Sequence, residues 1–122
     1  MKKLVFNESE IVGEADICGK AIDLINRESS DCESMSIATI LINPGDSSQR
    51  HFHKVMEEIY YFVEGEGLVE LGGEICHVGP GIAVFIPRNL LHHIENTGST
   101  TLKLISVDSP PFDTQDIYLE GQ

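Results

Sequence analysis

Three histidines and a glutamate in the middle of the chain have the side chains that together bind a metal ion: His51, His53, Glu58 and His92. Imidazole nitrogens combined with one carboxylate suit a divalent transition metal. His51 and His53 are two residues apart, so on a β-strand both side chains project from one face. A helix would space a metal-binding pair by three or four residues. The sequence therefore predicts a metal site that is carried by strands.

The elements that position these residues are predicted to be short strands. From residue 35 onward, apolar runs alternate with turn residues at intervals of roughly ten, which is typical of an all-β sandwich or barrel. The diglycine Gly72-Gly73 is expected to close a two-residue hairpin. Residues 7–29 are expected to form two edge strands and loops. The predicted barrel strands are residues 36–42, 58–63, 68–71, 74–78, 82–86, 91–95 and 101–107.

The chain is expected to form one domain, because 122 residues leave no room for a second. Within it we predict an N-terminal extension with edge strands over 1–34, a barrel over 35–109 and a C-terminal tail over 110–122. Pro110 and Pro111 cannot donate to a β-ladder, so the last barrel strand should end before them.

Charge and composition exclude several classes of function. The net charge is −12 with only 8 Lys and Arg, which disfavours binding to nucleic acid or to an anionic membrane. No apolar run approaches the ~18 residues of a membrane span, and the N-terminus lacks a secretory signal pattern. We therefore expect a cytoplasmic protein. The three cysteines are widely spaced, so we expect reduced, mostly buried thiols.

Two motifs around the four candidate ligands resemble those of the cupin superfamily. The first is a glycine, five residues, His-x-His, three or four residues, a glutamate, six residues and a glycine. The second is a glycine, five residues, Pro-x-Gly, two residues, a histidine, three residues and an asparagine. The matching residues are Gly45, His51, His53, Glu58 and Gly65 in the first motif and Gly81, Pro87, His92 and Asn96 in the second. Asn89 replaces the second glycine of the Pro-x-Gly turn, and asparagine tolerates left-handed backbone.

The resemblance implies a small single-domain cupin barrel, a double-stranded β-helix or jelly roll, with one divalent transition metal inside it. The implied ion is Fe, Mn, Ni, Co or Zn, and the implied ligands are His51, His53, Glu58 and His92. An open coordination position would then take a small-molecule ligand or substrate. We expect a small metalloenzyme of dioxygenase or isomerase/cyclase type, or alternatively a non-catalytic metal- or ligand-binding module. Small cupins also imply a homodimer, through a sheet face or an exchanged N-terminal strand.

Neighbouring residues offer alternative ligands. Glu57 precedes Glu58, and His93 follows His92, but adjacent strand residues point to opposite faces. Glu58 stands six residues before Gly65, as the first motif requires, so we assign Glu58 and His92 to the site. His77 is expected on the surface.

Three further side chains bear on the pocket. Tyr60 and Phe62 share the strand face of Glu58, so each is either a pocket wall or ordinary core. Arg88 is interpreted as a solvated turn residue rather than an anion-binding residue.

Overall fold

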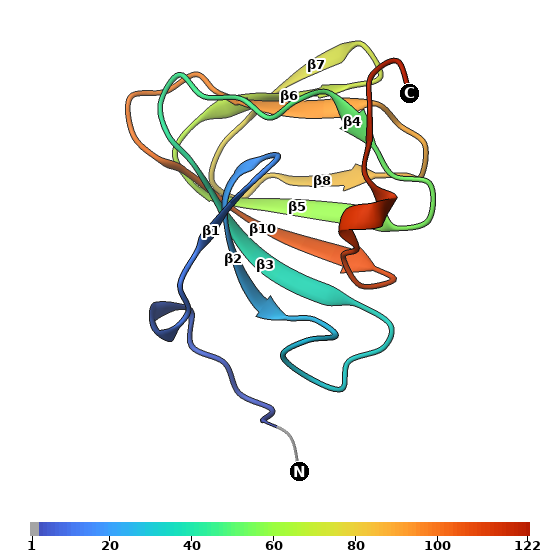
Figure 1. Cartoon of the computed structure of the whole chain (residues 1–122). Helices are drawn as coiled ribbons and strands as arrows, with labels where there is room; N and C mark the ends of the chain where they lie inside the picture. The colour runs from blue at the N-terminus through green and yellow to red at the C-terminus, as the bar shows by residue number, and fades with distance from the viewer. Residues whose placement is uncertain (1–2) are drawn as a thin grey trace.

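The computed structural model describes residues 3–122 and consists of two antiparallel β-sheets that face each other (Figure 1). One sheet has six strands in the order β1-β2-β3-β10-β5-β8, and the other has five in the order β11-β4-β9-β6-β7. This arrangement confirms the predicted all-β fold. The elements are η1 (Glu8–Glu10), β1 (Glu14–Asp16), β2 (Gly19–Ile25), β3 (Ser36–Ile42), β4 (His51–Phe52), β5 (Glu57–Glu64), β6 (Gly67–Leu71), β7 (Glu74–Val78), β8 (Ala83–Ile86), β9 (His92–Asn96), β10 (Leu102–Ser109), η2 (Thr114–Asp116) and β11 (Tyr118–Leu119).

Each of the seven strands predicted from residue 36 onward is present. Two have the predicted ends, and the ends of the other five shift by one or two residues. Gly72 and Gly73 have positive φ values of 57° and 94°, and they join β6 to β7 as the predicted hairpin turn. The strand that carries the histidine pair is shorter than the pattern suggested. It ends at Phe52, so His53 follows the strand instead of lying in it.

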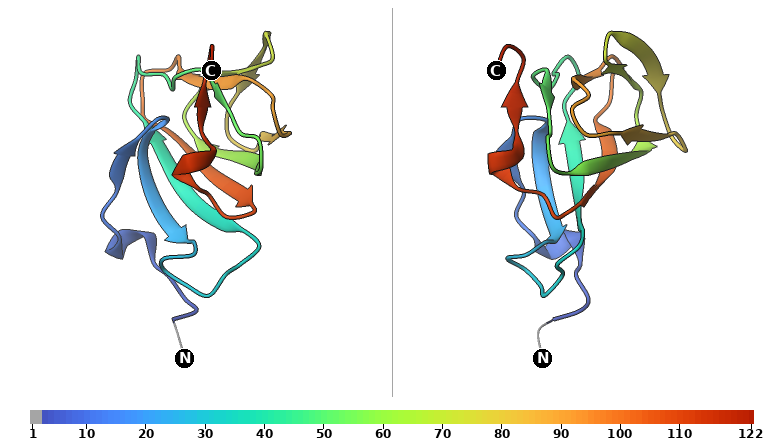
Figure 2. Two further views of the ribbon diagram at one scale, coloured as in Figure 1. Left: turned by 45° about the vertical axis from the view of Figure 1, so that its right-hand side comes forward. Right: turned by 90° about the vertical axis from the view of Figure 1, so that its right-hand side faces the viewer.

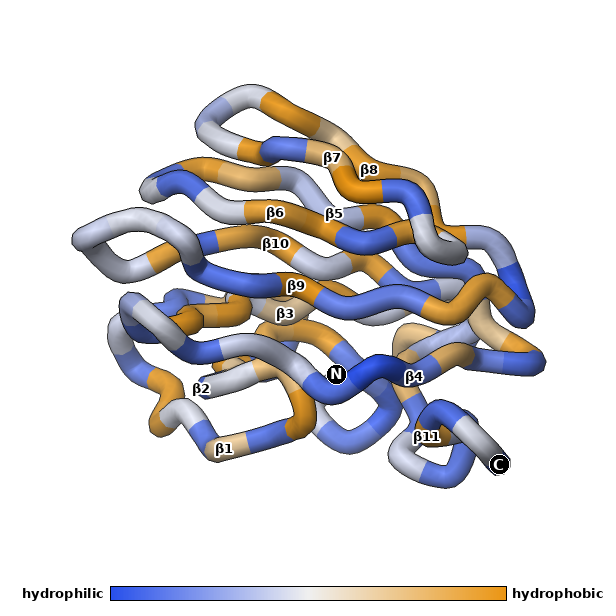
Figure 3. The backbone as a smooth tube through the Cα atoms, turned by 90° about the horizontal axis from the view of Figure 1, so that it is seen from above, coloured by the Kyte–Doolittle hydropathy of each residue, from blue (hydrophilic) through white to orange (hydrophobic). Residues whose placement is uncertain are grey.

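The core lies between the two sheets because the strands alternate apolar and polar side chains. On β5, Tyr60 and Phe62 are buried, whereas Ile59 and Tyr61 face outward. The buried cluster continues onto β6, β9 and β10 through Val69, Ile94, Leu102 and Leu104. On β8 both faces are hydrophobic, which appears as a continuous orange run in Figure 3.

Both ends of the chain extend the sheets. β1 and β2 form a hairpin, and β2 pairs with β3, so the N-terminal segment widens the six-stranded sheet. At the other end β10 stops at Ser109, directly before Pro110, and β11 then pairs with β4. Figure 2 shows this C-terminal segment running beside β4, where the histidine pair lies. The tail thus lies against the strand that carries His51.

Gly65, the last residue of the first motif, turns the chain from β5 into β6. Its φ is +83°, and a Cβ atom there would lie 2.6 Å from the carbonyl oxygen of Thr101. Only glycine meets both conditions without strain. The glycine of the motif therefore serves the backbone rather than the site.

Cys18, Cys32 and Cys76 are free thiols, but only Cys18 is buried, so the expectation of mostly buried thiols was wrong. Among the described residues no helix has both the length and the apolar character needed to cross a membrane.

Candidate metal centre

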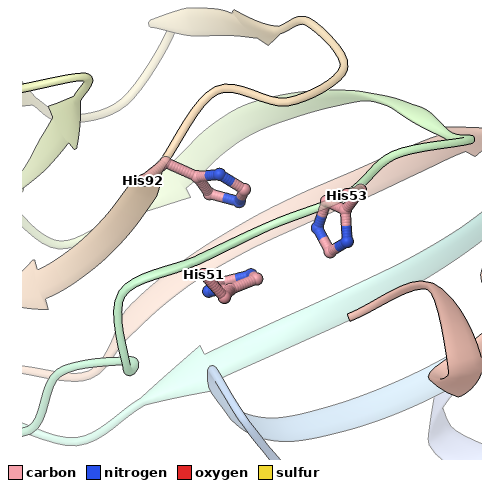
Figure 4. A group of neighbouring side chains, drawn as sticks. All are labelled: His51, His53 and His92. Carbon is pink, nitrogen blue, oxygen red and sulfur yellow. The ribbon is translucent and has the colours of Figure 1, made fainter. Parts of the chain in front are cut away.

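Three buried histidines point toward one another at one end of the barrel (Figure 4). His51 comes from β4, His53 follows it, and His92 begins β9, where it pairs with His51. One nitrogen from each ring lies within 4.8 Å of the corresponding nitrogens of the other two. The strands thus bring together the three histidines that the motifs identified.

The backbone fixes the orientation of all three rings. Each Nδ1 lies at hydrogen-bond distance from a backbone carbonyl oxygen and, because that oxygen can only accept, Nδ1 carries the proton. The remaining Nε2 atom then offers a lone pair, as in histidines whose second nitrogen binds a metal. The three acceptors for His51, His53 and His92 are the oxygens of Gln49, Asp116 and Leu90, at 2.7, 2.8 and 2.8 Å.

Glu58 reaches the same point from the opposite sheet, on β5. Its Oε1 atom lies 3.4 Å from Nε2 of His53 and 3.4 Å from Nε2 of His92. Its Oε2 atom accepts a hydrogen bond from the Ser106 hydroxyl at 3.2 Å. The carboxylate is therefore held with one oxygen toward the imidazoles.

The atoms that converge here have no hydrogen-bond partner in the part of the chain that the structure describes. Nε2 of His53, Nε2 of His92 and Oε1 of Glu58 are buried and make no hydrogen bond. Buried polar atoms without a partner are costly and are rare in native proteins. A divalent cation with a preference for mixed nitrogen and oxygen ligands would satisfy all three, so the donor set fits such an ion.

Burial and mutual charge set the protonation of the cluster. Burial and the neighbouring His92 lower the pKa of His51 to about 4, which keeps that ring neutral at pH 7. Burial opposes ionisation of Glu58, but the adjacent His53 and His92 rings outweigh it and lower the pKa of Glu58 well below the usual value. The Glu58 carboxylate outweighs burial at His53 in the same way and raises the pKa of that ring. The cluster thus combines an anionic oxygen with imidazoles.

A second buried carboxyl group, on Asp108, lies beside Glu58. The two residues are cross-strand partners on β10 and β5. Burial and the Glu58 charge raise the pKa of Asp108 to about 10, so this group is a neutral acid at pH 7. Sequence reasoning missed Asp108, because only the register between β10 and β5 places it next to Glu58.

Asp116, in the C-terminal tail, was also missed. Its backbone oxygen holds the His53 ring, and its carboxylate accepts hydrogen bonds from three consecutive backbone amides that follow His53. Those amides belong to Lys54, Val55 and Met56. An aspartate in a turn can be recognised from the local sequence. Nothing in the sequence, however, showed that Asp116 contacts a loop 60 residues earlier in the chain.

The alternative ligands that the sequence offered point away from the histidine cluster. Glu57 lies 3.6 Å from Arg88, outside the cluster. His93 points away from His92 and pairs with Glu70 at 2.9 Å. His77 is exposed, as expected.

The turn between β8 and β9 has the predicted conformation. Asn89 has a φ of 71°, which confirms that it takes the left-handed conformation of the family's glycine. Its backbone amide donates to the carbonyl oxygen of His53 at 2.7 Å. Arg88 donates to the carbonyl oxygen of Val55, so it stabilises the neighbouring loop.

A pocket opens beside the cluster, between the histidine loop and strands β2 and β3. The empty space in and in front of it, counted together with open solvent, is about 530 Å³. His51, His53 and Glu58 form one wall, and Tyr60 lines it as well. Phe62 belongs to the core instead.

A family model described as a cupin domain matches residues 38–108. An uncharacterized protein of Methanocaldococcus jannaschii, MJ1618, is 37% identical over 81 residues, which are 66% of this chain and 65% of that protein. The oxalate-binding protein of Thermotoga maritima is 32% identical over 84 residues, 69% of each chain. The matched part thus spans slightly less than two thirds of the first relative and slightly more than two thirds of the second.

Solved structures agree with the fold. A predicted oxalate decarboxylase from Thermotoga maritima has a TM-score of 0.79 at 29% identity and covers 88% of this chain and 99% of its own. The polyketide cyclase RemF from Streptomyces resistomycificus has a TM-score of 0.82 at 22% identity and covers 100% of this chain and 87% of its own, a likeness of fold alone.

Proposed function

The chain belongs to the cupin family, and on this premise we propose that it is a small metal-dependent enzyme acting on a small oxygenated molecule. In this proposal His51, His53, His92 and Glu58 hold one divalent transition metal ion. Four protein ligands leave one or two coordination positions open to the small molecule.

The observation that carries the proposal is the convergence of unpartnered donor atoms. Backbone carbonyls take the Nδ1 protons of all three histidines, and the buried Nε2 atoms of His53 and His92 lie with Oε1 of Glu58 without a hydrogen bond. Such an arrangement leaves buried polar groups unsatisfied unless a cation binds. Packing of a hydrophobic core alone gives no reason to bury these unpartnered polar atoms next to one another.

A bound ion of the Fe, Mn, Ni, Co or Zn type would supply Lewis acidity or, for a redox-active metal, reactivity toward O₂. The chain's own residues hold and orient the small molecule. Glu58 supplies fixed negative charge, while Asp108 and the Tyr60 hydroxyl supply hydrogen-bonding groups at the pocket wall. We propose dioxygenase or isomerase/cyclase chemistry, since both need such an open metal site.

Metal analysis of the purified protein tests the proposal. We expect close to one equivalent of a divalent transition metal at neutral pH, before or after reconstitution. His51→Ala and His92→Ala should each lower this content by at least about tenfold, because a ligand is lost. The exposed His77→Ala is the matched control and should retain the metal. A wild-type protein that takes up no metal, or a His77→Ala protein that loses as much as His92→Ala, would contradict the proposal.

The second candidate is a non-catalytic binding module that uses the same metal site. The observation in its favour is the 32% identity to a relative named for binding oxalate rather than for converting it. A metal-loaded protein that binds small oxygenated molecules, but leaves each of them unchanged with O₂ present and absent, would favour this candidate over the enzyme.

We further propose that two copies of the chain associate through the outer face of β5 and β8. Ile59, Tyr61 and Phe85 are exposed there by 45%, 45% and 56%, and Ile59 is the cross-strand partner of Phe85. Two copies of a chain with a net charge of −12 repel each other, so contact is favoured where a face is apolar and uncharged. A second copy offers the complementary apolar face.

A further inference from the structure

The pocket beside the candidate metal centre continues away from the histidines toward the N-terminal hairpin. Its far wall is formed by residues of the β1–β2 hairpin and of the segment after β2, among them Asp16, Asp23 and Asn26. Neither motif includes these residues. They nevertheless border the space in which a molecule bound near the metal would lie.

The described lining residues carry four carboxyl groups and include no lysine or arginine. The carboxyl groups belong to Asp16, Asp23, Glu58 and Asp108. The basic side chains for which the structure shows a partner are engaged elsewhere: Lys3 with Phe6, Arg50 with Glu70, Lys54 with Tyr118, Arg88 with Glu57 and Lys103 with Glu8. Because Asp108 is neutral at pH 7, the negative charge comes from Asp16, Asp23 and Glu58. A carboxylate ligand would meet repulsion from these groups, with no basic side chain among the described lining residues to offset it.

Two buried polar groups in the pocket also make no hydrogen bond with any described residue. Tyr60 is 1% exposed and Asp108 is 4% exposed, and neither the Tyr60 hydroxyl nor Oδ1 of Asp108 makes a hydrogen bond. Both residues line the pocket. Because buried polar atoms are normally satisfied, these two indicate where a ligand's polar groups are bound.

The pKa values of the two aspartates in the far wall agree with the acidic composition of the pocket. Burial raises the pKa of Asp16, and the nearby charges of Asp23 and Glu58 raise it further. Burial, with the charges of Glu14 and Glu28, likewise raises the pKa of Asp23. Both carboxyl groups thus lack the compensating positive charge that would lower their pKa values.

We propose that the pocket selects a small hydroxylated molecule that carries an amine, and that it rejects carboxylates such as oxalate. The hydroxyl groups lie toward the metal centre and the unpartnered groups of Tyr60 and Asp108, and the ammonium group lies toward Asp23. This inference rests on the proposed function, since it assigns the ligand class of the same site. It also separates this chain from its relative named for oxalate binding.

Three probes with the same carbon skeleton test the charge preference: 3-aminopropane-1,2-diol, glycerol and glycerate. Their dissociation constants are measured from amide chemical-shift changes of the full-length protein, both zinc-loaded and metal-free. In the metal-free protein we expect the aminodiol to bind at least about tenfold more tightly than glycerate. Because zinc attracts carboxylates, the metal-free measurement reports on the pocket wall alone.

Asp23→Asn is the informative variant, because no hydrogen bond of the Asp23 side chain is lost, whereas Asp16 accepts two backbone hydrogen bonds in its turn. We expect this variant to reduce the preference for the aminodiol over glycerate by about three- to tenfold in both forms. The exposed Asp46→Asn, outside the pocket, should leave the ratio unchanged.

Glycerate binding as tightly as the aminodiol in the metal-free protein would overturn the inference. So would an Asp23→Asn ratio equal to that of the wild type. A protein that takes up no zinc but keeps the preference contradicts the proposed metal site alone, so the two failures are distinguishable.

Discussion

Asp116 holds His53 in place although 63 positions separate the two residues in the chain. The backbone oxygen of Asp116 accepts the Nδ1 proton of His53 at 2.8 Å, and its carboxylate accepts hydrogen bonds from the next three backbone amides. The C-terminal tail therefore fixes both a candidate ligand and the loop that follows it. The site depends on a segment outside both sequence motifs.

Asp116→Ala should weaken metal binding without removing any ligand. The substitution leaves three backbone amides without their acceptor, so we expect a loss of roughly 2–4 kcal/mol in the free energy of unfolding. The backbone oxygen of Asp116 still accepts from the His53 ring, but the loop directly after His53 loses its carboxylate anchor, so the ring is less firmly placed. Metal affinity should therefore fall by about 10- to 100-fold. Chemical denaturation and competitive metal titration measure the two effects. Asp113→Ala, which removes one local hydrogen bond in the same segment, is the control and should change both quantities little. Equal metal affinity in Asp116→Ala and wild type would show that the tail does not support the site.

Asn96→Ala should destabilise the fold while leaving the metal site intact. This last residue of the second motif is buried, and its amide donates to the carbonyl oxygens of Ile42 and Thr100. It also accepts a hydrogen bond from the Gly98 amide. Losing these bonds should cost about 2–4 kcal/mol.

The readouts are the free energy of unfolding and the metal stoichiometry at saturating metal. The exposed Asn43→Ala should be nearly neutral in both. A folded Asn96→Ala protein that binds less than half an equivalent of metal would instead place Asn96 in the site.

Much of this arrangement was predictable from local patterns. Alternating apolar residues located the strands. The same alternation allowed only one of Glu57 and Glu58, and only one of His92 and His93, to face the site, and the motif spacing selected Glu58 and His92. The left-handed φ of Asn89 followed from its place in the turn. These features depend on a few neighbouring residues, so a single sequence carries them.

The residues that surround and hold the candidate ligands were not predictable, because their positions depend on pairing between distant segments of the chain. Asp108 becomes a neighbour of Glu58 only through the register of β10 on β5. Asp116 reaches His53 only because β11 pairs with β4. The acidic pocket wall likewise depends on how the β1–β2 hairpin lies against β3.

Asp108→Asn should flatten the pH dependence of stability of the metal-free protein. The pKa of Asp108 is about 10 in the folded state and near 3.8 when unfolded. The folded state therefore holds an extra proton between these values, so this group's contribution to stability is lost as the pH rises. The slope is at most about 1.4 kcal/mol per pH unit. Asparagine stays neutral, so the variant should lose less stability than wild type between pH 6 and pH 9. Urea denaturation across this range gives the comparison, and parallel curves for the two proteins would refute the assignment.

Acidification should release the bound metal. Metal binding needs neutral imidazoles, and protons compete for them as the pH falls. The Glu58 charge raises the pKa of His53, so this ring protonates first, whereas the lowered pKa of His51 keeps that ring neutral to about pH 4. We expect loss of most of the metal between roughly pH 7 and pH 5. Dialysis at stepped pH followed by metal analysis checks this, with circular dichroism to show that the fold persists. Metal retained by the folded protein well below pH 4, where His51 is protonated as well, would contradict histidine ligation.

Tyr61→Glu should convert the proposed dimer into a monomer. Tyr61 lies on the outward face of β5, in the apolar patch formed with Ile59 and Phe85. In a symmetric dimer the same patch contacts itself, so one substitution places two new carboxylates in the interface. Their desolvation and mutual repulsion should raise the dimer dissociation constant by at least about 100-fold.

Light scattering coupled to size exclusion, over a range of protein concentrations, measures this change. Ile75→Glu is the matched control, because Ile75 is 62% exposed on β7 of the other sheet. It introduces the same charge at an exposed apolar position outside the proposed interface. A monomeric wild type would refute the dimer, and a dimer disrupted by Ile75→Glu but not by Tyr61→Glu would move the interface to the opposite sheet.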